Sequence, residues 1–349
     1  MTSEVMTRLG LRAPIVQGPF GGGLSTVELA ATVAELGGLG SFGAYTFTPA
    51  AIEDIARQIK ARTDRPFALN LWVSNSDEGG STPDPALLDA LREELAPWLA
   101  ELGLDVPDPP ARFHESFDAQ VDAVLAAEPA VFSFVFGIPS PKILAACRAR
   151  GIVTAGAATN IAEARALDEA GVDLIVATGC EAGGHRPSFL ARAEDSLVGT
   201  FVLTQLVAPR VRAPVIAAGG IVDRRGLAAA RTLGADAVQI GTAFLACAES
   251  GASPEHRALL FDEARTQQTV LTRAFSGRLA RGLRNRWTDA HIDRALAPFP
   301  VQSWLTGVLK RAAIAQHRTD VISLWSSQAA PNLRHRTAAE LWAALTQEE

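Results

Sequence analysis

The sequence predicts a parallel (βα)8 barrel, the TIM-barrel fold of the α/β class, with a small helical lobe inserted after the eighth strand. Three observations point to this fold: short apolar runs recur eight times, helix-period stretches lie between most of them, and glycine motifs accompany the last two runs. Eight alternations of strand and helix close as a parallel barrel. An open doubly wound sheet is the competing prediction, which the count of eight and the position of the glycine motifs disfavour.

Each predicted strand is a short run of apolar and β-branched residues that ends in glycine or a polar residue. Such runs are typical of strands in a parallel sheet. In chain order they are Pro14–Phe20, Leu39–Ala44, Phe67–Val73, Val131–Gly137, Ile152–Ala157, Val172–Gly179, Pro214–Gly220 and Ala237–Leu245.

The stretches between the strands carry the signals of helix ends. Asn160 and Asp223 stand where a side chain caps a helix start, and Gly171 and Gly234 stand where a helix ends before the next strand. A unit of helix end, glycine, aspartate and strand occurs twice, which favours one repeated architecture over two unrelated domains. The predicted helices are Thr26–Leu36, Pro49–Arg62, Ser140–Arg150, Asn160–Ala170 and Asp223–Leu233, and the repeated units are Glu169–Val176 and Thr232–Ile240.

Two segments interrupt this alternation. Residues 79–128 form a long connection in which the pattern of Pro85–Glu101 predicts an extra helix beside the barrel. Residues 263–317 are mostly helix-patterned and rich in arginine, and we interpret them as a small lobe over the barrel mouth.

The predicted domain division follows from these segments. The barrel consists of residues 1–262 and 320–349, and the helical substrate-side lobe of residues 263–319. The chain returns to the barrel through Val321–Gln328, and we expect the tail Thr337–Gln347 to pack as the last barrel helix.

Composition and charge exclude several classes of protein. Of the 349 residues, 48% are hydrophobic and 20% are charged, which is ample for one large core or two modest ones. Lysine and arginine total 32 against 38 aspartate and glutamate, and no basic block stands out, so nucleic acid is not an expected partner. The polar start and the lack of roughly 18 to 20 consecutive apolar residues predict a cytoplasmic protein without a membrane span.

The three cysteines, Cys147, Cys180 and Cys247, are odd in number and far apart. We therefore expect reduced thiols, no disulfide and no metal site. Cys180, after the sixth strand, has two interpretations: a nucleophilic thiolate or, more often at such a position, a small buried apolar residue.

Glycine turns follow the two strands where barrels of this kind usually bind phosphate, the seventh and the eighth. Gly219 and Gly220 end the seventh strand, and Gln239, Gly241 and Thr242 lie within the eighth run. Bare backbone N–H groups at such turns can approach an anion. One pair of glycines more often only makes a tight turn, but two turns on adjacent loops favour a phosphate cradle.

The loop after the sixth strand contains the candidate catalytic residue, His185. Thr178 ends the strand, and Gly183 and Gly184 precede the histidine and let the backbone approach a ligand across the barrel mouth. A neutral imidazole is available as a base near pH 7. The alternative is a surface or backbone-bonded histidine, which is the expected role of His114, His256, His291, His317 and His335.

Other polar residues near these loops have weaker assignments. Glu181, Arg186 and Arg192 are expected to be solvated or to brace the loop rather than to act in catalysis. Asn70 is the lone amide in the third strand, and we expect it to point into the barrel mouth and to hydrogen-bond a flavin or sugar edge.

Taken together, these motifs resemble the nitronate monooxygenases, formerly called 2-nitropropane dioxygenases. The similarity covers most of the chain, and the string Glu-Ala-Gly-Gly-His that ends at His185 is highly specific to that family and its close relatives. The other matching motifs are Pro14–Pro19, Asn70, Ala218–Ile221, Gln239–Phe244 and Trp325–Gln328.

The resemblance implies a barrel that holds non-covalent FMN and acts on small nitro compounds with oxygen. His185 would take the α-proton of a nitroalkane or lie beside an already ionised nitronate, while the flavin supplies the redox chemistry. The oligomeric state stays open, a homo-oligomer included. The phosphate is expected near Gly220, Gly241 and Thr242 and the ring near Gly18, Asn70 and Gln328, and the full cofactor set is Gly18, Asn70, Thr178, Gly183, Gly219, Gly220, Gln239, Gly241, Thr242 and Gln328.

The sequence also departs from the family pattern. Many members have glutamine where Thr178 stands, and Tyr45 is the only tyrosine, so Phe299 or Trp304 is expected to fill the space of any tyrosine in the lobe. Two other functions remain open: an FMN-dependent NAD(P)H reductase of an enoyl thioester or a quinone, and a barrel that binds a phosphorylated ligand without redox chemistry.

Overall fold

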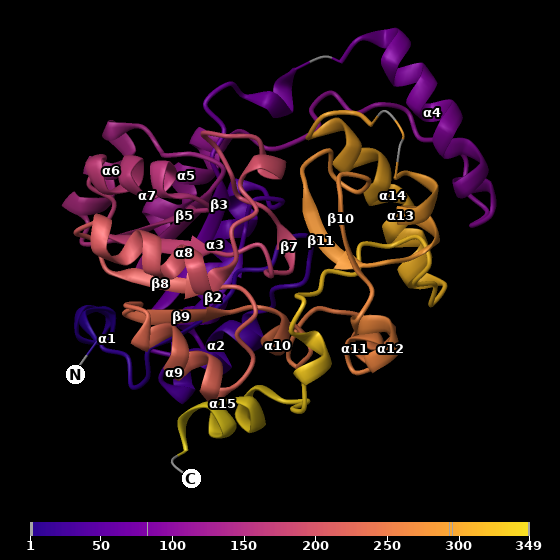
Figure 1. The fold of residues 1–349 in the computed structure, drawn as a ribbon. Coiled ribbons are helices and arrows are strands. Elements are labelled where there is room, and N and C mark those ends of the chain that lie inside the picture. The colour runs from indigo at the N-terminus through magenta and orange to yellow at the C-terminus, as the bar shows by residue number, and fades with distance from the viewer. Residues whose placement is uncertain (1–2, 82, 293, 295, 348–349) are drawn as a thin grey trace.

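Eight parallel strands form the centre of the computed structural model, which describes residues 3–81, 83–292, 294 and 296–347 (Figure 1). Neighbouring strands pair in the order β1, β9, β8, β6, β5, β4, β3, β2. All eight predicted strands are present and the fold class is confirmed, but the eighth is shorter than predicted, because Thr242–Leu245 forms a helix. Their bounds are β1 (Ile15–Gln17), β2 (Gly40–Gly43), β3 (Phe67–Trp72), β4 (Val131–Val135), β5 (Val153–Ala158), β6 (Leu174–Thr178), β8 (Val215–Ala218) and β9 (Ala237–Ile240).

The barrel closes between its first and second strands. Val16 forms a parallel bridge with Leu39, the residue just before β2. The Leu39 N–H donates to the Ile15 carbonyl at 3.0 Å, and the Gln17 N–H donates to the Leu39 carbonyl at 2.9 Å. The open doubly wound sheet is thereby excluded, because a sheet of that kind keeps two free edges.

Helices surround the barrel in the predicted places. The Asn160 side chain caps one helix by accepting from Glu163 N, and the Asp223 side chain caps another by accepting from Gly226 N. The tail helix α15 packs against α2 and α9, as predicted for the last barrel helix. Their bounds are α2 (Val27–Leu36), α3 (Pro49–Lys60), α5 (Phe117–Ala127), α6 (Pro141–Ala149), α7 (Ile161–Glu169), α8 (Thr200–Val207), α9 (Arg224–Thr232) and α15 (Ala338–Thr346).

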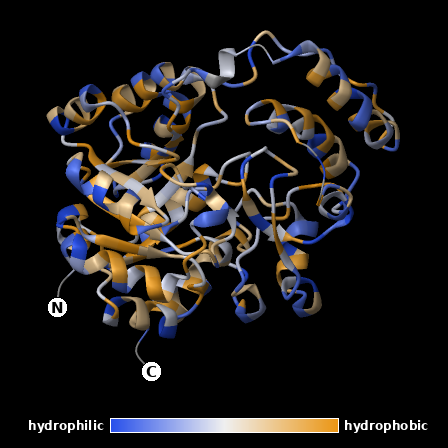
Figure 2. Ribbon diagram, turned by 45° about the horizontal axis from the view of Figure 1, so that its top comes forward, coloured by the Kyte–Doolittle hydropathy of each residue, from blue (hydrophilic) through white to orange (hydrophobic). Residues whose placement is uncertain are grey.

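A short N-terminal helix, α1 (Glu4–Leu9), covers one end of the barrel. Its buried Val5 and Leu9 pack on inward-facing strand residues such as Val131 and Leu174. Ser3 Oγ and the Val5 N–H both donate to Asp236 Oδ2, at 2.6 and 2.7 Å. Because Asp236 directly precedes β9, α1 covers the amino ends of the strands, so the open mouth lies at their carboxyl ends. Figure 2 shows the strands of the barrel as largely hydrophobic ribbon.

The lobe contains strands as well as helices. The structure has β10 (Thr269–Thr272) and β11 (Ala280–Leu283) as an antiparallel pair, which the sequence did not predict. A two-residue strand from the barrel side, β7 (Gly184–His185), pairs with β11 as the third member of this small sheet. Helices α10 (Thr242–Leu245) and α11 (Pro254–Leu260) precede the lobe, and the helices of the lobe itself are α12 (Glu263–Thr266), α13 (Arg286–Ala290) and α14 (Val301–Ala315).

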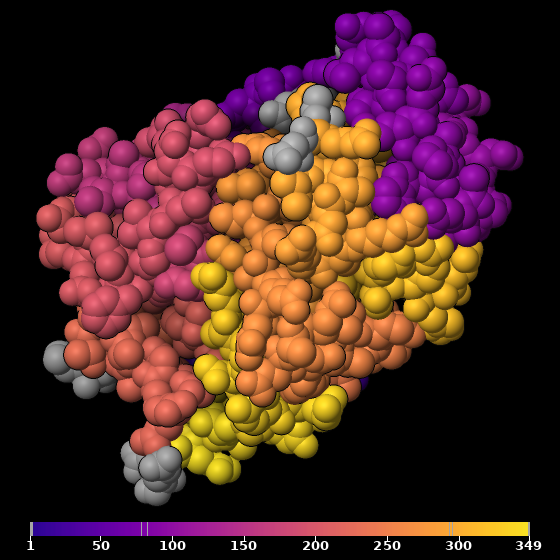
Figure 3. Space-filling model, turned by 45° about the vertical axis from the view of Figure 1, so that its right-hand side comes forward, coloured from indigo at the N-terminus to yellow at the C-terminus, as the bar shows by residue number. Residues whose placement is uncertain are grey.

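The extra helix predicted beside the barrel packs on the lobe instead. Helix α4 (Pro85–Ala100) buries Leu91, Leu95 and Leu99, and these side chains belong to the same apolar cluster as Leu305 and Leu309 of α14. Figures 1 and 3 show α4 at the outer side of the lobe, with the lobe between it and the barrel. Four 3-10 turns complete the described elements: η1 (Glu78–Gly80), η2 (Ala193–Asp195), η3 (Ala208–Arg210) and η4 (Ala330–Asn332).

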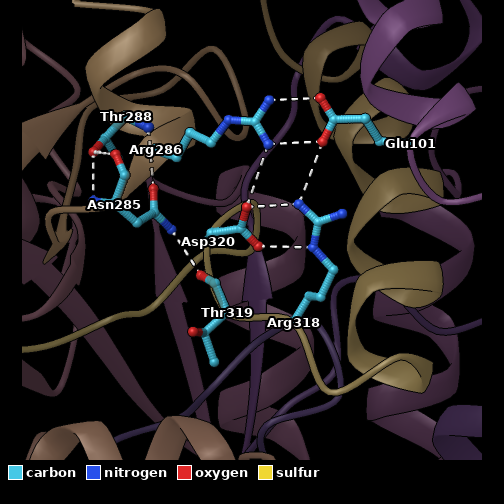
Figure 4. Close-up of polar contacts among 7 residues, drawn as sticks. All are labelled: Glu101, Asn285, Arg286, Thr288, Arg318, Thr319 and Asp320. Atoms are coloured by element: carbon cyan, nitrogen blue, oxygen red, sulfur yellow. Dashed lines mark hydrogen bonds and ion pairs between the residues drawn. The ribbon is translucent and has the colours of Figure 1, made fainter.

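An ion network fastens the end of α4 to the lobe (Figure 4). Arg286, at the start of α13, donates to both carboxylate oxygens of Glu101 at 2.6 and 2.7 Å. Arg318 contacts Glu101 at 3.4 Å and Asp320 at 2.7 Å, and Asp320 also faces Arg286 at 3.6 Å. The two arginines hold the pKa of Glu101 at about 2, mainly through the hydrogen bond from Arg286.

In the part of the chain that the structure describes, no helix combines the length and the apolarity that a bilayer crossing requires.

Candidate functional site

A cavity of about 510 Å³ lies at the mouth of the barrel, between the carboxyl ends of the strands and the lobe. Ligand pockets for small molecules typically occupy about 300 to 1,000 Å³. The strand ends form its floor, the loops after β1, β6, β8 and β9 form its sides, and α14 covers it from the lobe.

Ten of the eleven predicted site residues line this cavity. His185 and nine of the cofactor candidates come together there: Gly18, Asn70, Thr178, Gly183, Gly219, Gly220, Gln239, Gly241 and Thr242. Gln328 does not line it, because its side chain is exposed to solvent and its backbone N–H donates to the Glu181 carbonyl. The adjacent Ser327 lines the cavity in its place.

The two glycine turns differ in the space at their backbones: an added Cβ at Gly219 would lie 2.8 Å from Thr200 Oγ1, whereas Gly241 faces open space. Gly219 and Gly220 have φ of +111° and +69°, a conformation that favours glycine. At Gly241, an added Cβ would meet one atom, Cε1 of Phe20, at 3.8 Å. A side chain at position 241 would therefore fill cavity space without colliding with the protein.

A buried hydroxyl next to the second glycine turn lacks a partner. The Ser327 N–H donates to Thr242 Oγ1 at 3.0 Å, which places Ser327 beside this turn. Ser327 Oγ itself is buried and makes no hydrogen bond with any residue that the structure describes. Buried hydroxyls are normally paired, so this oxygen indicates a ligand with polar atoms in the cavity.

The loop before His185 is braced by buried arginines. The guanidinium of Arg186 donates to the carbonyls of Thr178 at 3.0 Å and Ser196 at 2.8 Å, and Arg281 donates to the carbonyl of Cys180 at 2.9 Å. Glu181 accepts from the backbone N–H of Thr200, at the start of α8. Arg186 and Glu181 therefore have the bracing role that the sequence suggested.

The Cys180 thiol has the properties of a structural residue. Burial and the nearby Glu181 carboxylate raise its pKa, which disfavours the thiolate. It is also absent from the residues that line the cavity. All three cysteines are free, and no cluster of three metal-binding side chains occurs among the residues described.

His185 projects into an aromatic part of the cavity. Its ring lies 4.7 Å from the ring of Trp72 and 5.2 Å from that of Trp325, between centroids. Its Nε2 lies 2.7 Å from Ser276 Oγ, on the lobe. Burial lowers the pKa of the imidazole to about 3, and the positive charges of Arg278 and Lys310 add to this effect. The ring is therefore neutral at physiological pH.

The lobe contributes charged and polar residues that the sequence interpretation missed. Lys310 of α14 lines the cavity and forms no hydrogen bond or ion pair within the described part of the chain, and burial lowers its pKa to about 8. The Arg278 guanidinium lies 4.1 and 4.2 Å from the ring centroids of Phe136 and Phe299. No local signal in the sequence pointed to Lys310, because it shares its helix face with Ser303 and Thr306 and is followed by a second cation, Arg311.

The single tyrosine of the chain lies on the barrel side of the cavity. The Tyr45 ring stacks on Trp72 at a centroid distance of 3.8 Å. Of the two aromatic residues expected to replace a lobe tyrosine, Phe299 packs on Trp72 at 5.1 Å, whereas Trp304 packs on Phe113 at 5.4 Å, away from the histidine.

A parallel barrel with two glycine turns and a neutral histidine lining the cavity at its mouth is typical of the class of (βα)8-barrel enzymes that bind a phosphorylated ligand or cofactor. Comparison with known proteins identifies the family: the profile described as nitronate monooxygenase matches residues 3–348. The chain belongs to the nitronate monooxygenase family, and it is a flavin oxidoreductase.

Individual relatives agree with this assignment. The chain is 40% identical to a nitronate monooxygenase of Paraburkholderia phytofirmans, over 97% of this chain and 93% of that protein. Among solved structures, a nitroalkane oxidase from Streptomyces ansochromogenes superposes with a TM-score of 0.90 at 36% identity, covering 98% of this chain and 96% of the other. FabK from Thermotoga maritima superposes with a TM-score of 0.75 at 27% identity, covering 99% and 95%.

Proposed function

We propose that this protein binds FMN at the barrel mouth and oxidises nitronates, and nitroalkanes after loss of their α-proton, with molecular oxygen. The observation that carries the proposal is the neutral imidazole of His185 in the same cavity as the unpaired ammonium of Lys310. A nitroalkane needs a base to lose its α-proton, and the resulting nitronate is an anion.

The cavity residues fit FMN. Gly220, Gly241 and Thr242, with the unpaired hydroxyl of Ser327, would hold the single phosphate, and Gly18 and Asn70 would lie near the ring. The Gly-x-Gly-x-x-Gly string of the sequence, residues 38–43, runs through strand β2 and does not open a helix to hold a pyrophosphate, which disfavours FAD. When bound, the flavin accepts electrons from the substrate and passes them to oxygen.

The protein side chains supply the proton acceptor and the charge. The neutral imidazole of His185 takes the α-proton of a bound nitroalkane, and the electron pair stays on the substrate as the nitronate. The ammonium of Lys310 attracts the anion and offsets its desolvation. Since a positive charge lowers the pKa of His185, a bound anion has the opposite effect and makes the imidazole a stronger base.

The surrounding rings make the reacting region apolar. Trp72, Phe136 and Trp325 enclose the imidazole on several sides. An apolar surrounding strengthens the attraction between a nitronate and the ammonium of Lys310, because the local dielectric constant is lower than that of water.

Two measurements on the purified protein test this function. The cofactor is released by heat and identified by chromatography, and the bound flavin is then mixed anaerobically with an alkyl nitronate or with NADH. We expect FMN, and bleaching by the nitronate. Recovery of FAD would contradict the cofactor assignment. Rapid bleaching by NADH and none by the nitronate would favour the alternative, an NAD(P)H reductase of an enoyl thioester or a quinone.

A further inference from the structure

Ser276 is the residue whose side chain hydrogen-bonds His185. Its hydroxyl oxygen lies 2.7 Å from Nε2 of the imidazole, and the two residues are 91 positions apart in the sequence. They meet because β7, which contains His185, pairs with β11 of the lobe, where Ala280 lies opposite His185. Ser276 is itself buried, with 5% of its surface exposed.

The hydroxyl of Ser276 has two further partners, both on Arg278. The Arg278 N–H donates to Oγ at 3.3 Å, and Oγ lies 3.2 Å from the Arg278 carbonyl, to which it donates. A serine hydroxyl has one proton to give and two lone pairs to accept with. With its proton on the Arg278 carbonyl, the oxygen accepts from the Arg278 N–H and from a protonated Nε2 of His185, and all its hydrogen-bonding capacity is used.

The loop that carries Ser276 is fixed to the lobe helices. The carbonyl of Ala274 accepts from Trp287 Nε1 at 3.1 Å and from Gln302 Nε2 at 2.8 Å. The carbonyl of Phe275 accepts from Thr306 Oγ1 at 2.5 Å. Because these bonds hold the two residues before Ser276, the hydroxyl keeps a defined position against the imidazole.

The two ring nitrogens of His185 differ in their partners. Nδ1 has no hydrogen-bond partner among the residues that the structure describes, whereas Nε2 is bonded to Ser276. In neutral histidine one nitrogen carries the proton and the other has the lone pair, and the bond at one nitrogen sets the state of the other.

We propose that Ser276 is a positioning residue that holds neutral His185 as the Nε2–H tautomer, so that Nδ1 is the nitrogen that takes the substrate proton. The inference rests on the proposed role of His185 as the base. In the transfer, the α-carbon to hydrogen bond breaks, the proton bonds to Nδ1, and the electron pair stays on the substrate as a nitronate. The imidazolium keeps its Nε2–H bond to Ser276, so the serine serves the ring before and after the transfer.

The test reads the tautomer directly, without turnover. Holoenzyme labelled with ¹⁵N at histidine is studied by NMR near neutral pH, with His185→Asn used to assign the signals. We expect a protonated Nε2 and an unprotonated Nδ1 in the wild type. In Ser276→Ala the Nε2 proton loses its acceptor, and we expect both nitrogens to shift toward averaged values as the ring exchanges between tautomers. A wild-type spectrum with the proton on Nδ1, or an unchanged spectrum in Ser276→Ala, would overturn the inference.

Two more variants separate positioning from general damage. Ser276→Thr keeps a hydroxyl and should restore the wild-type spectrum. Ser188→Ala is the matched control, because Ser188 lies three residues beyond His185 but its hydroxyl bonds Thr159 at 2.8 Å. This variant should leave the histidine spectrum unchanged. In turnover, Ser276→Ala should slow a neutral nitroalkane by about tenfold or more and the matching nitronate much less. An equal loss for both substrates, with unchanged flavin content, would count against the positioning role.

These results are distinguishable from a failure of the proposed function. If the wild type does not oxidise nitronates but His185 is the Nε2–H tautomer and changes in Ser276→Ala, the positioning stands and the substrate class is wrong. If nitronates are oxidised and the tautomer is the other one, the function stands and the role of Ser276 is wrong.

Discussion

Arg273 of the lobe and Glu194 of the barrel form a two-point ion pair. The Arg273 Nε lies 2.9 Å from Oε1 of Glu194, and its Nη2 lies 3.1 Å from Oε2. The same guanidinium donates to the Gly277 carbonyl at 2.8 Å, next to Ser276. The pair therefore ties the loop between β7 and α8 to the loop that contacts His185.

Removing this pair should destabilise the fold by only a small amount. In Glu194→Gln we expect a loss of at most about 1 kcal/mol of unfolding free energy, because both side chains are partly exposed. The hydrogen bond from Arg273 lowers the pKa of Glu194, so its contribution is present above the unfolded pKa and is lost as the pH falls through the folded value. Thermal unfolding at neutral and acidic pH measures the loss of stability in Glu194→Gln. The control is Asp195→Asn, at the exposed neighbouring residue. Equal melting temperatures for the two variants at neutral pH would contradict the predicted contribution of the ion pair.

Because of Lys310, nitronate binding should weaken at alkaline pH. Its pKa is about 8, so the ammonium is charged below pH 8 and loses its charge as the pH rises through that value. We expect KM for a nitronate to rise above pH 8 in the wild type. The Lys310→Met variant should have a high KM at every pH, because it lacks the positive charge. In Lys310→Arg the KM should stay constant above pH 8, because arginine stays charged. A rise that persists in Lys310→Arg would assign it to another group.

Gly241→Val should weaken flavin binding while the fold survives. The first added atom meets only Phe20 at 3.8 Å, so the side chain extends into the cavity. Filling ligand space with one side chain costs about 1 to 3 kcal/mol, or about 5- to 150-fold in Kd. Flavin titration of the apoprotein measures the loss, circular dichroism checks the fold, and Gly241→Ala should give a smaller effect. Full flavin affinity in Gly241→Val would make this glycine a turn residue only.

The network at Glu101 should control how firmly α4 stays on the lobe. Glu101→Gln removes the charge that two arginines share, and we expect faster limited proteolysis within residues 85–116. Glu93→Gln, an exposed glutamate on the same helix, is the control and should digest like the wild type. Because the arginines hold the pKa of Glu101 at about 2, the protection should persist in mild acid; loss of protection already at pH 5 would contradict this assignment.

Most of the barrel could be predicted because its signals are local. Caps such as Asn160 and glycine stops such as Gly234 act within a few residues, so they are visible in the sequence. The docking of α4 could not be predicted: the spacing of Leu91, Leu95 and Leu99 shows an apolar face but does not say that α14 covers it. The hairpin of the lobe was missed for a similar reason, since its strands are short and one partner is the two-residue β7.

The site residues on glycine-rich loops could be predicted, because glycine marks a close approach of the backbone. Side chains contributed by distant parts of the sequence were harder to predict. His185 could be assigned to the cavity because two glycines precede it in the loop after the sixth strand. Its partner Ser276, 91 residues away, carries no local signal, because the contact depends on the pairing of β7 with β11. Gln328 was chosen by motif, and its neighbour Ser327 lines the cavity instead.

His185 gives the sharpest prediction on the reaction. In His185→Asn, turnover of a neutral nitroalkane should fall by about 10²- to 10⁴-fold, the usual cost of removing a general base. The corresponding nitronate has already lost the proton, so its turnover should fall far less. Asparagine is close to imidazole in polarity and smaller, and FMN should stay bound because the phosphate-side turns are unchanged.

The comparison uses one enzyme and two protonation states of one substrate, measured by oxygen consumption with freshly prepared nitronate. A general loss of folding or of flavin would lower both rates alike, which bound-flavin absorbance would reveal. Equal losses with full flavin occupancy would mean that His185 serves binding or charge in the cavity and not proton abstraction. If neither rate fell, His185 would have no role in the reaction. The tautomer that Ser276 sets would then have no effect on catalysis.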